Sequence, residues 1–231
     1  MNLYMKGLRD GLPVGLGYLS VSFAFGVAAV HAGLPLWAAV AISFTNLTSA
    51  GQLAGLGVIT AAGGMIEMAL TQLVINLRYA LMSVSLSQKL DPAVKDHQRL
   101  MMAFGNTDEI YAIAVGKNGT VKASYFYGLM TLPWICWTGG TLLGAAADQI
   151  LPASVLSALG VAIYGMLVAI VVPAAKKSKV VALVAILAVA FSSCFRWVPG
   201  LNQISGGFSV ILSALVAATA GALLGPREEE V

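Results

Sequence analysis

The chain has 231 residues, of which 58% are hydrophobic and only 10% are charged, and its formal net charge is +3. A soluble protein carries on average about a quarter charged residues, so the charges present here are too few to cover a water-facing surface. The basic residues lie in short stretches between apolar runs, which favours membrane orientation over nucleic-acid binding. We therefore expect a multi-pass membrane protein surrounded by a lipid bilayer, with no nucleic acid among its partners.

Apolar segments follow one another along the chain, and nearly all have the length of about 20 residues that a membrane-spanning helix needs. None alternates with the period of two that a barrel strand requires, so all of them should be helical. The segments are 11–33, 35–63, 64–88, 123–146, 150–173, 179–195 and 203–224, with a weaker one at 101–116. They predict an all-α fold in one transmembrane domain, 1–231, with about six full spans and one or two broken or re-entrant segments.

Positive charges orient the segments, because Lys and Arg gather in cytoplasmic loops. Lys6 and Arg9 place the N-terminus in the cytoplasm. If 35–63 crossed the membrane completely, the basic loop at 89–99 would lie outside, so we expect 35–63 to enter from outside and return, and 101–116 to enter from the cytoplasmic side. Full spanning stays an alternative, because acidic residues in the same loop soften its penalty. Four further helices, over 123–224, complete the chain.

The stretch NLTSAGQL, residues 46–53, places amide and hydroxyl side chains in the middle of the 35–63 segment. Irregular polar backbone at membrane depth is tolerated where it faces protein or a water-filled cavity, and paired half-helices are a device of transporters. We expect a helix break here, with Thr48 or Ser49 capping the second half-helix and Gln52 in its first turn. Asn46, Thr48, Ser49 and Gln52 are then candidates for binding a polar substrate group.

Four motifs of the first half of the chain resemble the AzlC family of branched-chain amino acid permease components. They are GLPVGLGYLSVSFAFGVAAVHAG, TSAGQLAG, NLRYALM and NTDEIYA, and the resemblance covers roughly residues 7–116. The resemblance implies export of branched-chain and similar apolar amino acids across a bacterial cytoplasmic membrane, together with a small hydrophobic AzlD-type partner subunit. The family pattern often has His after the Arg of NLRYALM; Tyr79 stands there in this chain, so no role of that His carries over.

Arg78 is the most informative single residue. It lies eleven positions before Lys89, or about 16 Å along a helix with a rise of about 1.5 Å per residue. A cation at that depth costs roughly 2.5 to 3.5 kcal/mol, so it needs an anionic partner. The candidate partners are Asp108, Glu109, Glu67 and the carboxylate of a substrate. A purely structural ion pair stays an alternative, and Asn76, two residues before Arg78, is either a contact between helices or a substrate ligand.

Asn106-Thr107-Asp108-Glu109 is open to two interpretations. Thr107 has the character of a helix cap, and two acids in a first helical turn suit the positive end of the helix dipole. Two adjacent acids in a segment that enters the membrane also describe a proton-coupling or gating site. We expect the broken segments 35–63 and 101–116 to meet, with Arg78 and the half-helix after Thr48 holding a substrate carboxylate, and Asp108 or Glu109 countering Arg78 when the site is empty.

Other motifs narrow the function further. There is no G-x-x-x-x-G-K-[ST] loop, no H-E-x-x-H and no G-x-S-x-G, and His31 and His97 lack metal-ligand spacing, so we expect no enzyme, no metal and no cofactor. Gly7, Gly11 and Gly15 form a small-residue stripe suited to close helix packing, and Cys136 and Cys194 are interpreted as small core residues. The expected function is a secondary transporter subunit driven by an ion gradient. A channel, a structural membrane subunit and, less favoured, an intramembrane enzyme stay as alternatives.

Overall fold

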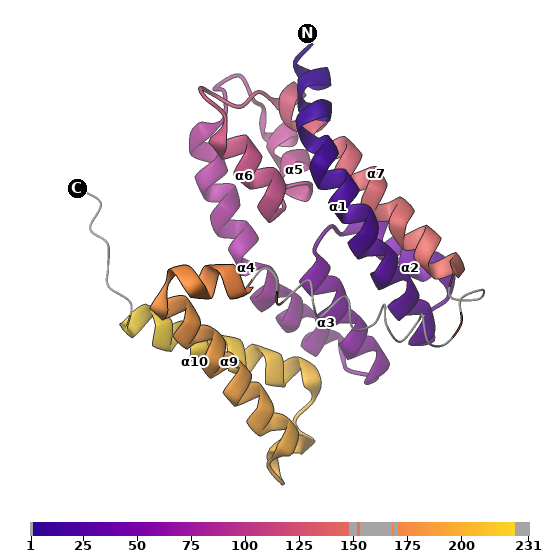
Figure 1. Cartoon of the computed structure of the whole chain (residues 1–231), viewed down its shortest axis with the longest axis vertical. Coiled ribbons are helices and arrows are strands. Elements are labelled where there is room, and N and C mark those ends of the chain that lie inside the picture. The colour runs from indigo at the N-terminus through magenta and orange to yellow at the C-terminus, as the bar shows by residue number, and fades with distance from the viewer. Residues whose placement is uncertain (1, 148–151, 153–167, 169–170, 225–231) are drawn as a thin grey trace. The chain divides into compact units, whose positions relative to one another are not determined.

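The structure, a computed structural model, describes residues 2–147, 152, 168 and 171–224, and its described residues form helices joined by short connections (Figure 1). The chain divides into two compact units. The first comprises Met1–Leu53 and Asn76–Ile163, and the second comprises Ala54–Ile75 and Tyr164–Val231. The two helices α3 (Ser49–Thr60) and α4 (Met65–Lys89) each begin in one unit and end in the other.

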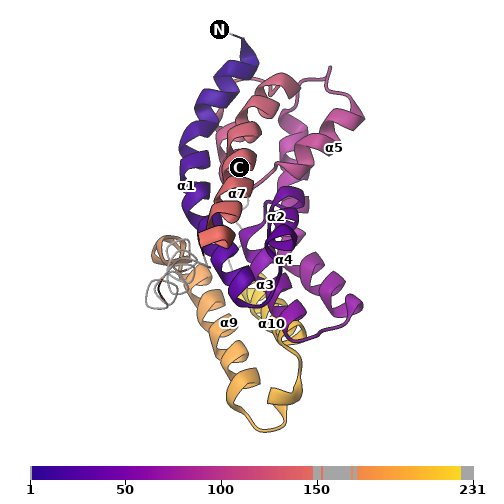
Figure 2. The same cartoon turned by 90° about the vertical axis from the view of Figure 1, so that its right-hand side faces the viewer.

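The first unit is built on two long helices, α1 (Leu3–His31) and α7 (Ala123–Ala147), which lie side by side in both views (Figure 1, Figure 2). Asn2 caps α1, because its Oδ1 accepts the Tyr4 N–H at 3.3 Å. Helix α1 therefore begins eight residues before the apolar segment predicted at 11–33, and it continues through Pro13 without ending. The polar first turns belong to the same helix as the apolar span.

Glycines let the backbones of α1 and α7 touch. A Cβ atom added at any of six glycines would collide with backbone or side-chain atoms of the facing helix. These glycines are Gly7, Gly11 and Gly26 on α1, and Gly128, Gly140 and Gly144 on α7. Gly15 stands in the same row, opposite Leu132 and Cys136. Small residues permit such close approach in membranes, so the packing role predicted for Gly7, Gly11 and Gly15 is confirmed.

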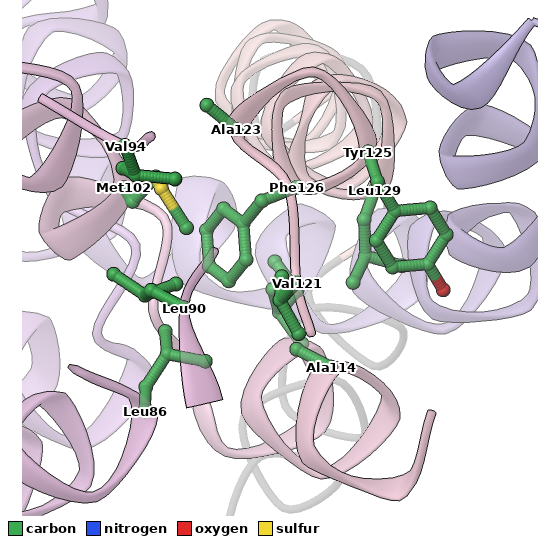
Figure 3. Close-up of a cluster of buried hydrophobic side chains, with 11 residues drawn as sticks. Leu86, Leu90, Val94, Met102, Ala114, Val121, Ala123, Tyr125, Phe126 and Leu129 are labelled. Carbon is green, nitrogen blue, oxygen red and sulfur yellow. The ribbon is translucent and has the colours of Figure 1, made fainter. Parts of the chain in front are cut away.

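Shorter helices complete the first unit: α2 (Leu36–Thr45), α5 (Asp96–Phe104) and α6 (Asp108–Gly116), with the end of α4. Buried side chains of α5, α6 and the end of α4 form one hydrophobic cluster with the start of α7. Figure 3 shows the Phe126 ring at its centre, with Met102 and Leu90 on one side and Val121 on the other. A pair of backbone hydrogen bonds, Asp91 N to Val121 O at 3.0 Å and Val121 N to Lys89 O at 2.9 Å, joins the two loops that border this cluster.

The second unit contains α9 (Lys179–Trp197), a short 3₁₀ helix η1 (Leu201–Gln203) and α10 (Gly206–Leu224), with the end of α3 and the start of α4. Helices α9 and α10 pack against each other. Ser178 caps α9 by accepting the Val181 N–H at 3.4 Å. Gly200, with φ of 93°, makes the turn after α9, a conformation that a side chain disfavours.

The length and apolar composition of the helices are those expected in a membrane. In the described ranges, α1, α4, α9 and α10 are long and apolar enough to cross a bilayer, and α7 has 25 residues. Leu73, Leu77, Leu81 and Val84 form an exposed apolar stripe along α4, which is expected where a helix faces lipid or another hydrophobic subunit. The all-α, multi-pass fold predicted from the sequence is confirmed.

Element boundaries refine the prediction in two places. The segment 35–63 consists of two helices separated at residues 46–48, and the segment 101–116 contains the end of α5, a break at 105–107 and α6. The predicted span 150–173 lies almost wholly outside the described residues. Both cysteines are free, but the interpretation as core residues is wrong for Cys194, which is exposed; Cys136 is half-buried.

Candidate functional site

Hydrogen bonds from its own polar side chains stabilise the break between α2 and α3. Asn46 has an extended backbone, and its Oδ1 accepts both the Thr48 N–H at 2.8 Å and the Thr48 hydroxyl at 2.6 Å. Gln52 donates from Nε2 to the Asn46 carbonyl at 2.8 Å, and its N–H donates to the Thr48 carbonyl at 2.9 Å. Helix ends in a membrane need such partners for their free backbone groups. As predicted, the second half-helix begins at Ser49, with Gln52 in its first turn.

A chain of buried hydroxyl groups ties this break to the α1–α7 pair. Gln52 Nε2 also donates to Ser43 Oγ at 3.1 Å, and Ser43 Oγ lies 2.7 Å from Thr141 Oγ1 of α7. The Thr141 hydroxyl lies 3.1 Å from the Trp137 carbonyl and 3.3 Å from the Ser22 carbonyl of α1. Ser43 and Thr141 have no exposed surface, so each hydroxyl depends on these partners.

Tyr18 of α1 lies at the junction of the two helix breaks. Its ring meets the Trp137 ring edge-on, with centroids 5.1 Å apart, and Leu47 from the first break packs into the same cluster. Its hydroxyl oxygen lies 2.7 Å from Thr107 Oγ1 and 2.5 Å from Glu109 Oε2, both at the second break. Tyr18 therefore contacts residues of both helix breaks.

The second break, between α5 and α6, is buried and polar. Asn106 and Thr107 are only 2% and 4% exposed, and Asn106 Nδ2 donates to Ser83 Oγ of α4 at 3.1 Å. Thr107 occupies the cap position of α6, but its side chain makes no capping hydrogen bond. The predicted capping role of the Thr107 side chain is therefore wrong, because that hydroxyl bonds to Tyr18 instead.

Arg78 forms an ion pair with Asp108, the first residue of α6. Arg78 Nη2 lies 2.8 Å from Asp108 Oδ2, and the same nitrogen donates to the Tyr79 hydroxyl at 3.0 Å. The guanidinium carbon also stands 4.8 Å from the centroid of the Tyr79 ring, which places the cation on an aromatic face. Of the three acids that the sequence offered as partners, the structure pairs Arg78 with Asp108, whereas Glu109 accepts from Tyr18.

The exposure of this ion pair decides what it faces. The side chains of Arg78 and Asp108 are 47% and 44% exposed, although α4 is long and apolar enough to cross a membrane. Charged groups directed at hydrocarbon cost several kcal/mol each. The open side of the pair must therefore face water or protein rather than hydrocarbon.

The remaining residues predicted for the site lie in different surroundings. Ser49 begins α3 and is half-buried, as is Asn76 on α4. Glu67 belongs to the second unit, where its Oε1 accepts hydrogen bonds from Ser205 and Gly207. Among the described residues, no group of three or more His, Cys, Asp or Glu side chains is arranged to hold a metal ion.

Sequence reasoning missed several residues that organise the site: Tyr18, Ser43, Trp137 and Thr141. Their common signal is a polar group within an apolar helix, which is also the signal of ordinary contacts between membrane helices. Tyr18 stood inside one of the family motifs without an assigned role.

These features define a class: an α-helical, multi-pass membrane protein in which two broken helical segments meet beside an accessible ion pair. Residues 13–151 match the AzlC family, described as AzlC protein, and this chain belongs to that family. The matched range includes both helix breaks and the Arg78–Asp108 pair.

Two relatives are membrane proteins. The inner membrane protein YgaZ of Escherichia coli strain K12 is 29% identical over 146 residues, which are 62% of this chain and 60% of the relative. An uncharacterized membrane protein of Archaeoglobus fulgidus is 30% identical over 173 residues, 74% of this chain and 75% of the relative. The chain thus spans less than two thirds of the length of the E. coli relative. No solved structure matches it.

Proposed function

We propose that this chain is the large subunit of a secondary transporter that exports branched-chain and similar apolar amino acids across a bacterial cytoplasmic membrane, driven by an ion gradient. The observation that carries the proposal is the half-exposed Arg78–Asp108 pair beside two helix breaks. Membership of the AzlC family supports the same conclusion. Together, a cation, a carboxylate and helix ends offer complementary partners for both charges of an amino acid.

Substrate binding would exchange one ion pair for two. With the site empty, Asp108 neutralises Arg78. An arriving substrate carboxylate competes with Asp108 for the guanidinium, and the released Asp108 is then available to the substrate ammonium group. One guanidinium nitrogen of Arg78, Nη2, makes the contacts to both Asp108 and Tyr79. Asp108 therefore does not form the bidentate pair that a guanidinium permits. A substrate carboxylate that accepts two parallel hydrogen bonds from Arg78 would bind the guanidinium more strongly.

An aromatic cluster beside the breaks suits an apolar side chain. Trp134 stacks obliquely on Phe44, with centroids 4.8 Å apart, and meets Phe104 edge-on at 6.1 Å. Phe44 lies near the end of α2 and Phe104 ends α5, so the cluster gathers where both half-helices stop. Trp134 Nε1 also donates to the Phe44 carbonyl at 2.9 Å. Apolar surface next to convergent polar groups is the usual composition of a small-molecule site.

We further propose a small hydrophobic AzlD-type partner subunit, in keeping with the family. The exposed apolar stripe of α4 is compatible with a protein neighbour or with lipid. A channel or a structural subunit is the alternative function, in which the Arg78–Asp108 pair only holds α4 and α6 together. The alternatives differ in kinetics, since a carrier saturates and exchanges substrate across the membrane whereas a channel does not.

The test is efflux of preloaded labelled leucine, valine and methionine from cells that express the chain with and without the partner. Arg78→Ala removes hydrogen bonds to a charged group that are worth about 1.5–3 kcal/mol, so efflux should fall by roughly 10-fold or more. The matched control is Arg196→Ala, which removes the same side chain from an exposed position on α9 and should leave efflux unchanged. Normal efflux and apparent affinity in Arg78→Ala would refute the proposed binding role, and non-saturating flux in the unaltered chain would favour a channel.

A further inference from the structure

The second unit contains a buried carboxylate that the proposed binding site does not use. Glu67 lies in the first turn of α4 and is only 6% exposed. Its Oε1 lies 2.5 Å from Ser205 Oγ and 2.9 Å from the Gly207 N–H, at the start of α10. Among the described residues, no Lys or Arg forms an ion pair with it. Within the described part of the chain, hydrogen bonds and the positive end of the α10 dipole balance its negative charge.

A second group next to Glu67 lacks a partner. Thr71 lies one turn further along α4, has no exposed surface, and its hydroxyl makes no hydrogen bond in the described part of the chain. The Thr71 hydroxyl and the Glu67 carboxylate both lie against Gly207, because a Cβ added to Gly207 would stand 2.5 Å from Glu67 Oε1 and 2.7 Å from Thr71 Oγ1. A buried hydroxyl without a partner costs about 1–3 kcal/mol, and this cost is removed if a hydrogen-bonding group or a cation reaches the Thr71 hydroxyl.

We propose that Glu67 binds and releases the proton whose gradient drives transport. The inference rests on the proposed transport function and names its coupling ion. Two donors already occupy Oε1, so the proton joins Oε2, which lies near Gly63 in the turn before α4. Protonation converts a buried anion into a neutral acid, and release of the proton restores the carboxylate that caps α10.

The surroundings favour a proton over a metal cation such as Na⁺. The groups that face Glu67 in the described structure are Ser205 and Gly207 at the start of α10, Gly63 before α4, and Thr71 on its own helix. None of them is charged or titrates near neutral pH. The N–H of Gly207 and the dipole of α10 direct positive charge at the carboxylate and so weaken the binding of any cation, but a proton needs only one free oxygen of Glu67 whereas a metal ion needs several oxygen ligands. A neutral carboxylic acid keeps both hydrogen bonds to Oε1.

The experiment uses inside-out membrane vesicles from cells expressing the full chain with the proposed partner subunit. Two quantities are measured: accumulation of labelled leucine when the vesicle interior is one pH unit more acidic, and exchange of leucine for leucine at equal pH. One pH unit supports at most about tenfold accumulation for one proton per substrate. The unaltered chain should approach this ratio. A sodium gradient at equal pH forms a parallel arm and should drive no accumulation.

Glu67→Gln is the decisive variant, because its amide imitates the protonated acid and keeps an oxygen for Ser205 and Gly207. We expect its accumulation ratio to fall to about 1 while exchange stays within about twofold of the unaltered chain, since the neutral form is one state of the cycle. Glu67→Asp retains a titratable carboxyl and should keep part of the accumulation. The matched control is Asp96→Asn, the same chemical change at an exposed residue that begins α5, which should change neither quantity.

Any other result contradicts the role of Glu67, the proton as coupling ion or the transport function itself. Accumulation that persists in Glu67→Gln removes Glu67 from proton coupling. A Glu67→Gln chain that is absent from the membrane, or that loses exchange as well, shows that the neutral form is not a working state, which contradicts the proposal. Accumulation driven only by sodium replaces the proton as the coupling ion. If the unaltered chain neither accumulates nor exchanges leucine, the proposed transport function fails, and the inference about Glu67 fails with it.

Discussion

Two neighbouring glycines of α7 give a sharp test of the α1–α7 contact, because the same substitution should have opposite effects at the two positions. A Cβ added to Gly140 would lie 2.5 Å from the Leu19 carbonyl oxygen and 3.2 Å from its carbon, and closer still to Ser22 Oγ. A Cβ added to Gly139 would meet nothing within 4 Å. In both variants alanine gains about 0.8–1 kcal/mol of helix propensity over glycine, so this contribution cancels when the two are compared.

What separates the variants is the collision at Gly140. The Leu19 carbonyl must retreat by about 1 Å, and inserting a methyl group into such a tight contact costs about 1–3 kcal/mol. For a chain of this size the melting temperature of Gly140→Ala should lie roughly 3–10 °C below that of Gly139→Ala, with Gly139→Ala at or above the unaltered protein. Purified protein in mild detergent is heated, and the fraction that stays monodisperse on gel filtration is measured. Equal melting temperatures, or a more stable Gly140→Ala, would refute the close contact between Gly140 and the backbone of α1.

Three further predictions concern the site and the membrane path. Tyr18→Phe removes the hydroxyl beside Glu109 and should lower the free energy of unfolding by about 1.5–3 kcal/mol; an unchanged melting temperature would contradict the bond. Asp108→Asn removes both the competitor for Arg78 and the carboxylate proposed for the ammonium group, so binding should shift from leucine towards its 2-oxo acid, which lacks the ammonium group, whereas a purely structural pair predicts an equal loss for both. With both native cysteines replaced, Ala32→Cys and Ala61→Cys should react with an impermeant maleimide from the same outer side, and labelling from opposite sides would establish that 35–63 spans the membrane.

Much of the fold followed from where polar residues interrupt apolar runs. Both breaks, at 46–48 and 105–107, fall on such interruptions, because a run of amides and hydroxyls is hard to place in hydrocarbon unless the helix stops. The early start of α1 was not predictable from hydropathy, since its first turns are polar. Their helical structure depends on the Asn2 cap and on packing of Gly7 against α7, a contact between distant parts of the chain.

For the charged residues, too, the sequence predicted one part of the arrangement and not the other. That Arg78 needed an acid followed from its depth alone, but Asp108 and Glu109 are adjacent and the sequence did not distinguish them. The difference arises because neighbouring side chains of α6 point in different directions, so that one acid reaches Arg78 and the other reaches Tyr18. The bond between Ser43 and Thr141 joins residues 98 positions apart. No local pattern marks such a pair, which is why these hydroxyls had no assigned role.

The glycine contacts between α1 and α7 also constrain the number of residues in α1. Gly7, Gly11, Gly15 and Gly26 face one partner only because the number of residues between them fits the helical repeat. A single inserted residue between Gly15 and Gly26 would turn every later side chain by about 100° around the helix. Gly26 would then leave the contact, and a side chain would enter it. Evolution can therefore lengthen the connections between the helices much more freely than it can lengthen α1, whose residue count is set by its partner.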